Sequence, residues 1–587
     1  MHTRGVAVGI TLGLLLISPM FLAVDYQKFF SASSDLDLFV NPYFPFYVSM
    51  VAASLALVLL LPTRKRQYVF DLFFLGGVMI LMSGYATFLS TSLRSASPFA
   101  LLAVTEPIHV ATAKDILVHG HLAVGEVFYH SWPLSFLLLA MLSGVLGIPV
   151  AGIPYVNFLL STALQFLVLL CLYLLGKMFY GHGAITVFLY YVAAFYFFGG
   201  GGGTLAGFSP QLFAFPFIVL YIIVTYKGMK RGSVGINVLL LLFTFVIVFS
   251  NITSAAFLAC FVSSTILVQR LAHSSIFGAL AVRISVICVA VLAWLIYFVS
   301  FDFAQLFAPS TGGGFWSFLA QYALSSATGS GNPYLAVTVW YVALLKLYRT
   351  WVILLPMLAG ILGFLFFVRT EKSPKLRYLA MAIGLSFAAF AVFDMVFLRV
   401  FENFWERIFS LGYPFLALFA LTILRTLRSH VPRSLRPFVG KKALGFSIFA
   451  LILMSFLASN VSLTLGYSSS EFSTATFLSR HCSDCVLGMS HQFYEILRFP
   501  DIEKRYSFDQ TIFHSDYDMK FFTARLSEQP TFYDTGTIVR TNREVAFFYA
   551  AFGIQYSDFW GKIDYSLTTK PGFDRVFDSG SERIFSQ

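Results

Sequence analysis

Charged residues are scarce in this chain of 587 residues. Asp, Glu, Lys and Arg make up 11% of it, whereas a soluble globular domain contains about 25%. Hydrophobic residues make up 58%, and the mean hydropathy is +0.79. This composition excludes a soluble globule and predicts a polytopic membrane protein that has the lipid bilayer as a partner.

The N-terminus lacks the pattern of a cleaved signal peptide. Its first apolar run, 5–24, is longer than the hydrophobic region of a typical signal peptide, which has about 7–15 residues. It also has no convincing small-residue cleavage site. We therefore expect this run to be a membrane span.

The net charge of +11 does not indicate a nucleic-acid partner, because of where the charge lies. Residues 464–587 carry 12 basic and 16 acidic residues, which leaves +15 on the preceding part of the chain. There the basic residues fall mostly in short links between apolar runs, as membrane topology requires.

Apolar runs of about 20 residues, the length that crosses a bilayer, predict an all-α membrane domain over 1–463 with about 13 transmembrane helices. The runs are 5–24, 44–62, 68–90, 155–176, 184–199, 209–226, 234–250, 253–269, 284–301, 351–368, 378–398, 408–424 and 443–463.

The run 133–147 is shorter, and the charge distribution decides how it is interpreted. If this run does not cross the bilayer, 20 of the 27 basic residues before 464 lie in the cytoplasm; if it crosses, only 8 do. The positive-inside rule favours the first option. We therefore predict re-entrant or interfacial helices in a first outer loop, 91–154. We also predict a cytoplasmic N-terminus and an extracellular C-terminal domain at the plasma membrane.

The tail, 464–587, has a different composition, with more polar and charged residues. We predict a small extracytoplasmic α+β domain with strands at 484–489 and 531–539. Helical segments are predicted at 471–480, 492–498 and 544–552. Val576 and Phe577 face Ile584 and Phe585 across the turn residues 578–580, a pattern typical of a hairpin.

The first outer loop concentrates the chemistry-bearing side chains. Between Pro98 and Pro133 there are four histidines and three carboxylates. Helical spacing before Gly120 places Glu106 and His109 one turn apart on one face. A carboxylate that a re-entrant element shields from water suits a general base. The alternative is that Glu106 only complements the helix N-terminus.

The same loop resembles a known family. Its order of motif residues is similar to the first outer loop of prokaryotic, especially archaeal, GT-C-type glycosyltransferase-like membrane proteins. The residues that carry this likeness are Glu106, His109, Ala113, Ile116, Gly120, His121, Tyr129, Trp132 and Pro133. The likeness extends to Phe208-Ser209-Pro210-Gln211 at the start of a span, to Arg407 before a late span and to the closing Asp-Ser-Gly hairpin.

The resemblance implies an inverting hexosyltransferase that moves a sugar from a polyprenyl-phosphate carrier to a protein or glycan acceptor. Glu106 and His109 would be catalytic. Substrate would be bound by Arg407, Arg399, Lys346, Arg349, His121, Tyr129, Trp132 and Gln211. Arginine suits a departing lipid phosphate because guanidinium binds phosphate oxygens bidentately; the alternative for Arg407 is a local ion pair with Glu402 or Glu406.

Two departures from the family pattern argue against a metal site. The usual first-loop Asp is Glu106 here, and the next outer loop, 199–209, contains no carboxylate. The WWDYG signature of oligosaccharyltransferases is missing as well. We therefore expect no metal and no cofactor. The alternative, a metal site of His119, His121, Glu126 and His130, matches no zinc spacing closely.

Two other function classes stay open. The Glu-for-Asp change and the acid-free loop are compatible with a catalytically silent scaffold or assembly partner. A transporter or flippase of lipid-linked sugars is less favoured, because we find neither internal repeats nor broken midplane segments. Cys482 and Cys485 are candidates for a disulfide outside the cell.

Overall fold

The structure is a computed structural model of the whole chain. It describes residues 75–78, 106–122, 132–181, 183, 186–187, 208–229, 233–271, 358–397, 411–412, 414–416, 418–423, 474, 476–478, 486–488, 507–508, 537–540, 574–578 and 583–586.

Most described helices overlap the predicted apolar runs, and α5 lies in the first loop, where helical spacing predicts a helix. They are α5 (Glu106–His119), α6 (Leu134–Val145), the short η4 (Val150–Gly152), α7 (Ile153–Tyr180), α9 (Pro210–Gly228), α10 (Val234–Ser250), α11 (Ile252–Leu271) and α16 (Pro374–Phe397), with apolar helices at Leu358–Thr370 and Pro414–Ile423. Within the described ranges, α7, α9, α11 and α16 are long and apolar enough to cross a membrane. The chain is therefore a multi-pass membrane protein.

Several predicted spans lie outside the described residues, so the number thirteen stays a prediction. They are 5–24, 44–62, 284–301 and 443–463, together with most of 68–90 and 184–199.

The ends of the spans follow from local sequence. α9 begins at Pro210, and the Ser209 side chain accepts a hydrogen bond from the Leu212 amide at 3.0 Å, which satisfies an N–H that has no partner within the helix. α7 ends at Tyr180, and the cap residue Gly181 adopts the left-handed conformation with φ 73° and donates its N–H to the Lys177 carbonyl. Glycine adopts this conformation without steric cost.

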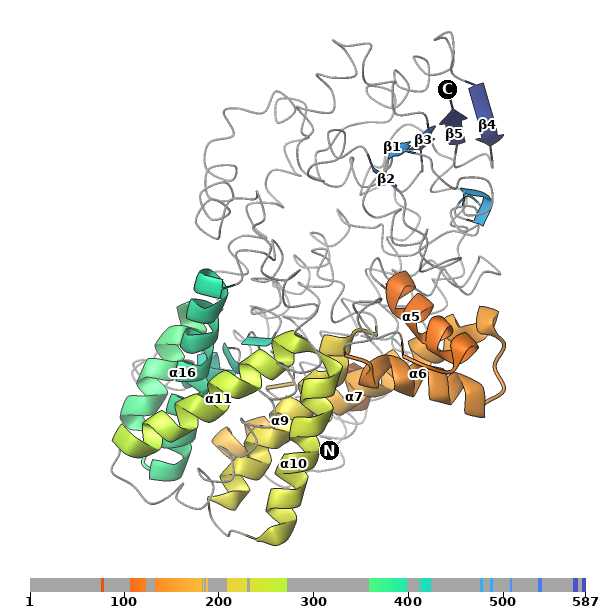
Figure 1. The fold of residues 1–587 in the computed structure, drawn as a ribbon. Coiled ribbons are helices and arrows are strands. Elements are labelled where there is room, and N and C mark those ends of the chain that lie inside the picture. The colour runs from red at the N-terminus through yellow and green to blue at the C-terminus, as the bar shows by residue number, and fades with distance from the viewer. Residues whose placement is uncertain are drawn as a thin grey trace, which may run out of the picture.

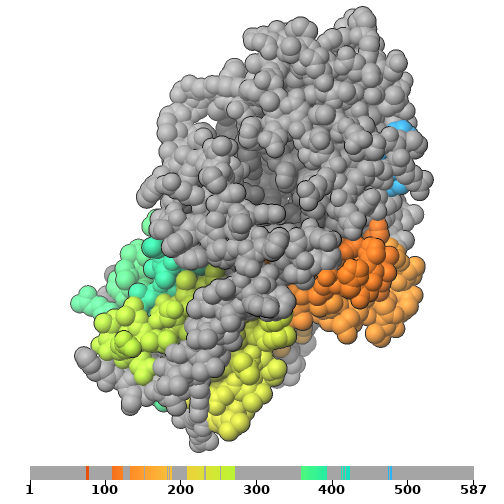
Figure 2. All heavy atoms as spheres, viewed as in Figure 1, coloured from red at the N-terminus to blue at the C-terminus, as the bar shows by residue number. Residues whose placement is uncertain are grey.

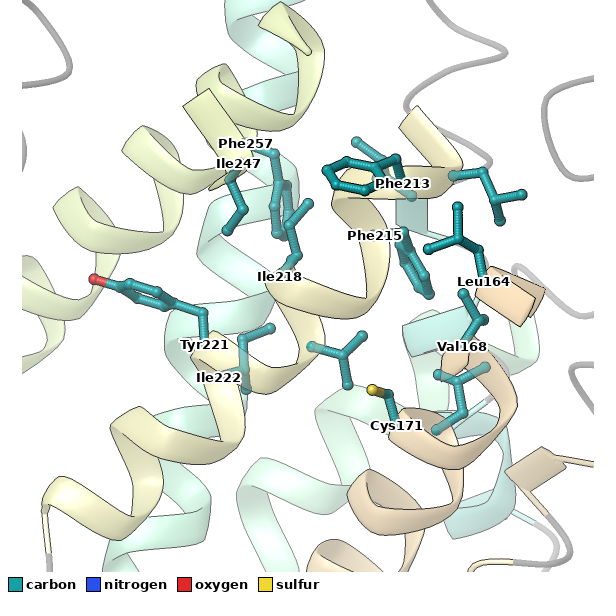
Figure 3. Packing of buried hydrophobic residues seen from close by; sticks show 14 of the residues in the cluster. Leu164, Val168, Cys171, Phe213, Phe215, Ile218, Tyr221, Ile222, Ile247 and Phe257 are labelled. Atoms are coloured by element: carbon teal, nitrogen blue, oxygen red, sulfur yellow. The ribbon is translucent and has the colours of Figure 1, made fainter. Parts of the chain in front are cut away.

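The core of the bundle is the seam between α7, α9, α10 and α11 (Figure 3). Leu164, Val168 and Cys171 of α7 lie beside Phe215 of α9. α11 and α16 make the most extensive helix contact described. Phe257, in the first half of α11, contacts Phe387 and Phe390, in the second half of α16. In a membrane such seams are stabilised by close packing rather than by removal of apolar surface from water.

One end of the bundle collects basic residues. Lys375 Nζ at the start of α16 donates to the Met229 carbonyl at the end of α9, at 2.8 Å. The hydroxyls of Tyr180 and Thr422 are 2.8 Å apart, which brings the end of α7 to the end of Pro414–Ile423. We call this the basic end; it carries Lys177, Lys227, Arg270, Arg369, Lys372, Lys375 and Arg377.

The tail forms a mixed five-stranded sheet. Its strands are β1 (Val486–Gly488), β2 (Ser507–Phe508), β3 (Thr537–Arg540), β4 (Asp574–Asp578) and β5 (Arg583–Ser586), in the order β2-β1-β3-β5-β4. β1 pairs in parallel with β2 and β3, and β5 is antiparallel to β3 and β4. In Figure 1 the sheet lies on the side of the molecule away from the α9–α10 connection.

The sheet confirms most of the predicted strands. β1 and β3 fall in or overlap the predicted segments 484–489 and 531–539, and the closing hairpin is β4–β5 with a register shift between Arg575 and Phe577. β2 was not predicted. Residues 476–478 are helical within predicted 471–480, whereas 492–498 and 544–552 lie outside the described residues. The domain boundary at 463/464 stays a prediction.

Candidate functional site

The predicted first outer loop contains the helix that its spacing predicts. α5 begins at Glu106 and ends at His119, and Gly120 follows it with φ 70°. Glu106 therefore stands on the first turn, three residues before His109, and the two positions share one edge of the helix. The Glu106 backbone is described, but its side chain is not, so the catalytic role of this carboxylate stays a prediction.

His109 joins this loop to a distant part of the chain. Its side chain is 5% exposed, and its Nδ1 lies 3.0 Å from the carbonyl oxygen of Phe208, 99 residues later. A carbonyl only accepts, so Nδ1 carries the proton and donates. In the neutral ring Nε2 is then the acceptor, because this bond selects the tautomer.

α6 lies against α5 and forms a wall of the site. The rings of His109 and Phe136 have centroids 5.7 Å apart, and Trp132 is buried just before α6. Gly144 approaches Leu117 so closely that an added Cβ would stand 3.4 Å from Leu117 Cδ1. With 12 residues, α6 is about 18 Å long, shorter than a bilayer core of about 30 Å.

The second motif with family likeness meets the first at this point. Phe208 precedes Ser209, the N-cap of α9, and Gln211 follows in the first turn of that helix. Ser209 and Gln211 are both 5% exposed. The structure thus places His109, Trp132 and Gln211 on elements that pack together, at the end of α9 opposite the basic end.

His121 is placed differently from these residues. It is exposed, and its Nδ1 donates to the His119 carbonyl at 3.1 Å. His119 Nδ1 donates to Asp115 Oδ1 at 2.9 Å. Figure 2 shows α5 and α6 at the surface of the molecule. His121 therefore lies in the exposed segment that follows α5 rather than in the buried contact around His109.

Metal-ligating side chains do not gather within the described ranges. No group of three or more His, Cys, Asp or Glu side chains suited to a metal occurs there. Glu126 and His130, which the alternative metal site needs, lie outside those ranges, as do Cys482 and Cys485.

Several predicted substrate-binding residues also lie outside the described residues. These are Arg407, Arg399, Lys346, Arg349 and Tyr129. Their role in binding a lipid phosphate or a sugar stays a prediction.

Two groups at this site were not anticipated. The Phe208 carbonyl is a backbone group, so no residue type could mark it as the partner of His109. Ser135 in the first turn of α6 is fully buried; a serine just after Trp132-Pro133 at a helix start was the signal that could have identified it.

We expect His109→Phe to lower the free energy of unfolding by about 1–3 kcal/mol, because the Phe208 carbonyl loses a buried donor. His109→Asn, whose amide nitrogen takes the place of Nδ1, should retain most of that stability. Thermal unfolding in detergent measures the difference, with the exposed His121→Phe as the control. Equal stability of wild type and His109→Phe would show that the hydrogen bond contributes nothing.

No known protein family matches this chain, and no curated protein matches it. Among solved structures, the chain is similar to ArnT from Cupriavidus metallidurans in the apo state. The TM-score is 0.37 and the sequence identity 11%, over 87% of this chain and 97% of that chain.

Proposed function

We propose that this protein transfers a sugar from a polyprenyl-phosphate carrier to a protein or glycan acceptor at the outer face of the membrane, as a GT-C-type glycosyltransferase. The observation that carries the proposal is the bond between His109 and the Phe208 carbonyl. It brings His109 of the first motif next to Phe208 of the second, and the resemblance of both motifs to that family was noted separately in the sequence.

The distribution of charge supports an outer location for this site. The basic end carries nearly all the described Lys and Arg side chains of the membrane part, so the positive-inside rule assigns it to the cytoplasm. α5 lies against the opposite end of α9, and the tail sheet lies away from the α9–α10 connection (Figure 1). Both would then be extracytoplasmic.

The proposed reaction is a single displacement. The Glu106 carboxylate accepts the proton of an acceptor hydroxyl, and the hydroxyl oxygen attacks the anomeric carbon. A new C–O bond forms as the bond to the carrier phosphate breaks, and its electron pair leaves on the phosphate oxygen. Inversion at the anomeric carbon follows from the family resemblance. Arg407 and Arg399 are proposed to stabilise the departing phosphate, and Lys346 and Arg349 are further candidates for this role.

His109 suits a positioning role in this reaction. Its ring is held from one side by the Phe208 carbonyl and from another by Phe136. A buried ring with a fixed tautomer is suited to orient the carboxylate one turn earlier.

The direct test is turnover by the purified full-length protein with a panel of polyprenyl monophosphate and diphosphate sugars. We expect sugar release from at least one monophosphate donor. EDTA should leave the rate unchanged, because the next outer loop lacks the carboxylate that metal-dependent members of the family carry. Binding of the donor without any turnover would reject the transferase and favour the scaffold. A rate that EDTA abolishes would reject the metal-free mechanism.

A further inference from the structure

One face of the helix Leu358–Thr370 is exposed and apolar. Between 44% and 56% of each residue on this face is exposed, and its members recur at helical spacing: Leu358, Ile361, Leu362, Leu365 and Phe366. Residues three and four positions apart lie on one side of a helix. We call these five residues the apolar stripe; an exposed apolar surface of this size marks contact with lipid or with a partner.

The other face of the same helix packs inside the protein. Gly360 and Gly363 approach the helix Pro414–Ile423 so closely that a Cβ added at either would stand 2.7 Å from a backbone atom of that helix. Phe367 is 3% exposed, and its ring packs against Phe419. These contacts fix the helix with the apolar stripe outward.

The apolar stripe leads to the basic end. Arg369 follows the last member of the stripe by three residues, on the same side of the helix, and both Arg369 and the nearby Lys372 are exposed. The segment 369–377 carries four basic residues and one acidic residue, Glu371, whose carboxylate accepts the Ser373 N–H at 2.9 Å. Within the described part of the chain no carboxylate forms an ion pair with Arg369 or Lys372. The stripe thus ends beside two exposed positive charges.

The length of this surface matches one leaflet of a bilayer. From Leu358 to Arg369 the helix rises about 16 Å, and half of a hydrocarbon core of about 30 Å is about 15 Å. A lipid whose acyl chains lie along the stripe therefore has its headgroup at the level of Arg369. The positive-inside rule assigns the basic end to the cytoplasm, and the cytoplasmic leaflet is the one that carries a negative surface potential.

We propose that the apolar stripe, together with Arg369 and Lys372, binds an anionic phospholipid of the cytoplasmic leaflet. The acyl chains cover the stripe, the Arg369 guanidinium binds the phosphate oxygens, and Lys372 adds a second positive charge. Charge favours this occupant over a second copy of the chain, because two copies with the same orientation in the membrane would bring their basic ends together. The site is separate from the proposed transferase site and does not depend on transfer activity.

The test titrates the delipidated full-length protein with phosphatidylglycerol or with zwitterionic phosphatidylcholine and measures bound lipid by native mass spectrometry. We expect Arg369→Gln to weaken phosphatidylglycerol binding by about fivefold, and its combination with Lys372→Gln by about tenfold or more, because each basic residue adds to the attraction of an anionic lipid. Phosphatidylcholine binding should not change. Arg369→Lys combined with Lys372→Arg keeps both charges and should retain most of the phosphatidylglycerol affinity. Equal phosphatidylglycerol affinity in wild type and the double glutamine variant would overturn the proposal.

Lys227→Gln is the matched control for Arg369→Gln. Lys227 is exposed at the basic end, in the last turn of α9, but no apolar residue of α9 is exposed beside it. Removing this charge should therefore weaken phosphatidylglycerol binding much less than Arg369→Gln does. An equal loss in the two variants would mean that the basic end as a whole attracts anionic lipid, and it would overturn the assignment to the apolar stripe.

Photolabelling locates the acyl chains. In phosphatidylcholine nanodiscs, phosphatidylglycerol with a diazirine in its acyl chain should label the segment 358–370, and Arg369→Gln should lower that labelling while the melting temperature stays unchanged. Labelling that avoids this segment would overturn the proposal. Two copies per nanodisc that cross-link through this helix would identify a second copy as the occupant and would overturn it as well.

Discussion

Glu106→Gln is expected to lower the rate of sugar transfer by about 10²–10⁴-fold, the contribution of a positioned general base. Glutamine keeps the length of the side chain and removes the group that accepts the proton. Glu106 begins α5, one turn before the buried His109, so the change should not disturb the contacts that hold this helix. Single-turnover transfer from the best donor of the panel measures the loss.

Two further variants determine whether the loss is specific to Glu106. Glu106→Asp restores the residue that the resembling family has at this position and should retain a large part of the rate. Asp115→Asn changes the second acidic residue of α5, whose side chain is 8% exposed and accepts from His119 Nδ1 at 2.9 Å. This variant should leave the rate within a few-fold of wild type. A rate in Glu106→Gln close to that of wild type would refute the assignment of the base.

Helix positions were predictable because each span is an apolar run between charged links. The run 234–250 coincides with α10, and 155–176 lies inside α7. Basic residues in the links also predicted which helix ends lie together, and the contact between Lys375 and the Met229 carbonyl places two of those ends side by side. Apolar length and charge are local properties, so a single sequence reveals them.

The contacts that build the candidate site are not local, and the sequence could not reveal them. His109 and Phe208 are 99 residues apart, and the acceptor is a carbonyl that every residue possesses. The partner of a buried histidine depends on how α9 is placed beside α5, which no periodicity encodes. Strand β2 has only two residues and pairs in parallel, so it shows neither alternation nor a hairpin turn.

Close approach between helix backbones is another long-range feature, and it involves the glycines of Leu358–Thr370. A Cβ added to Gly360 would stand 2.7 Å from the Leu416 carbonyl oxygen, and one added to Gly363 would stand 2.7 Å from the Phe419 carbonyl carbon and closer still to its oxygen. Phe367 also packs against Phe419. Small residues let membrane helices approach in this way. These glycines therefore determine the distance between the helices Leu358–Thr370 and Pro414–Ile423.

Gly363→Val is therefore expected to lower the free energy of unfolding by about 3 kcal/mol or more, at or above the upper part of the range for overpacking. The atoms in the way belong to backbone, which cannot rotate aside as a flexible side chain can. Gly235→Ala in α10, where an added Cβ meets nothing nearer than Ser233 Oγ at 4.0 Å, should change stability by less than about 1 kcal/mol. Denaturation in mixed detergent micelles measures both variants. If Gly363→Val is as stable as Gly235→Ala, the backbones of Leu358–Thr370 and Pro414–Ile423 are not in contact. A loss of stability in Gly363→Val alone establishes that contact.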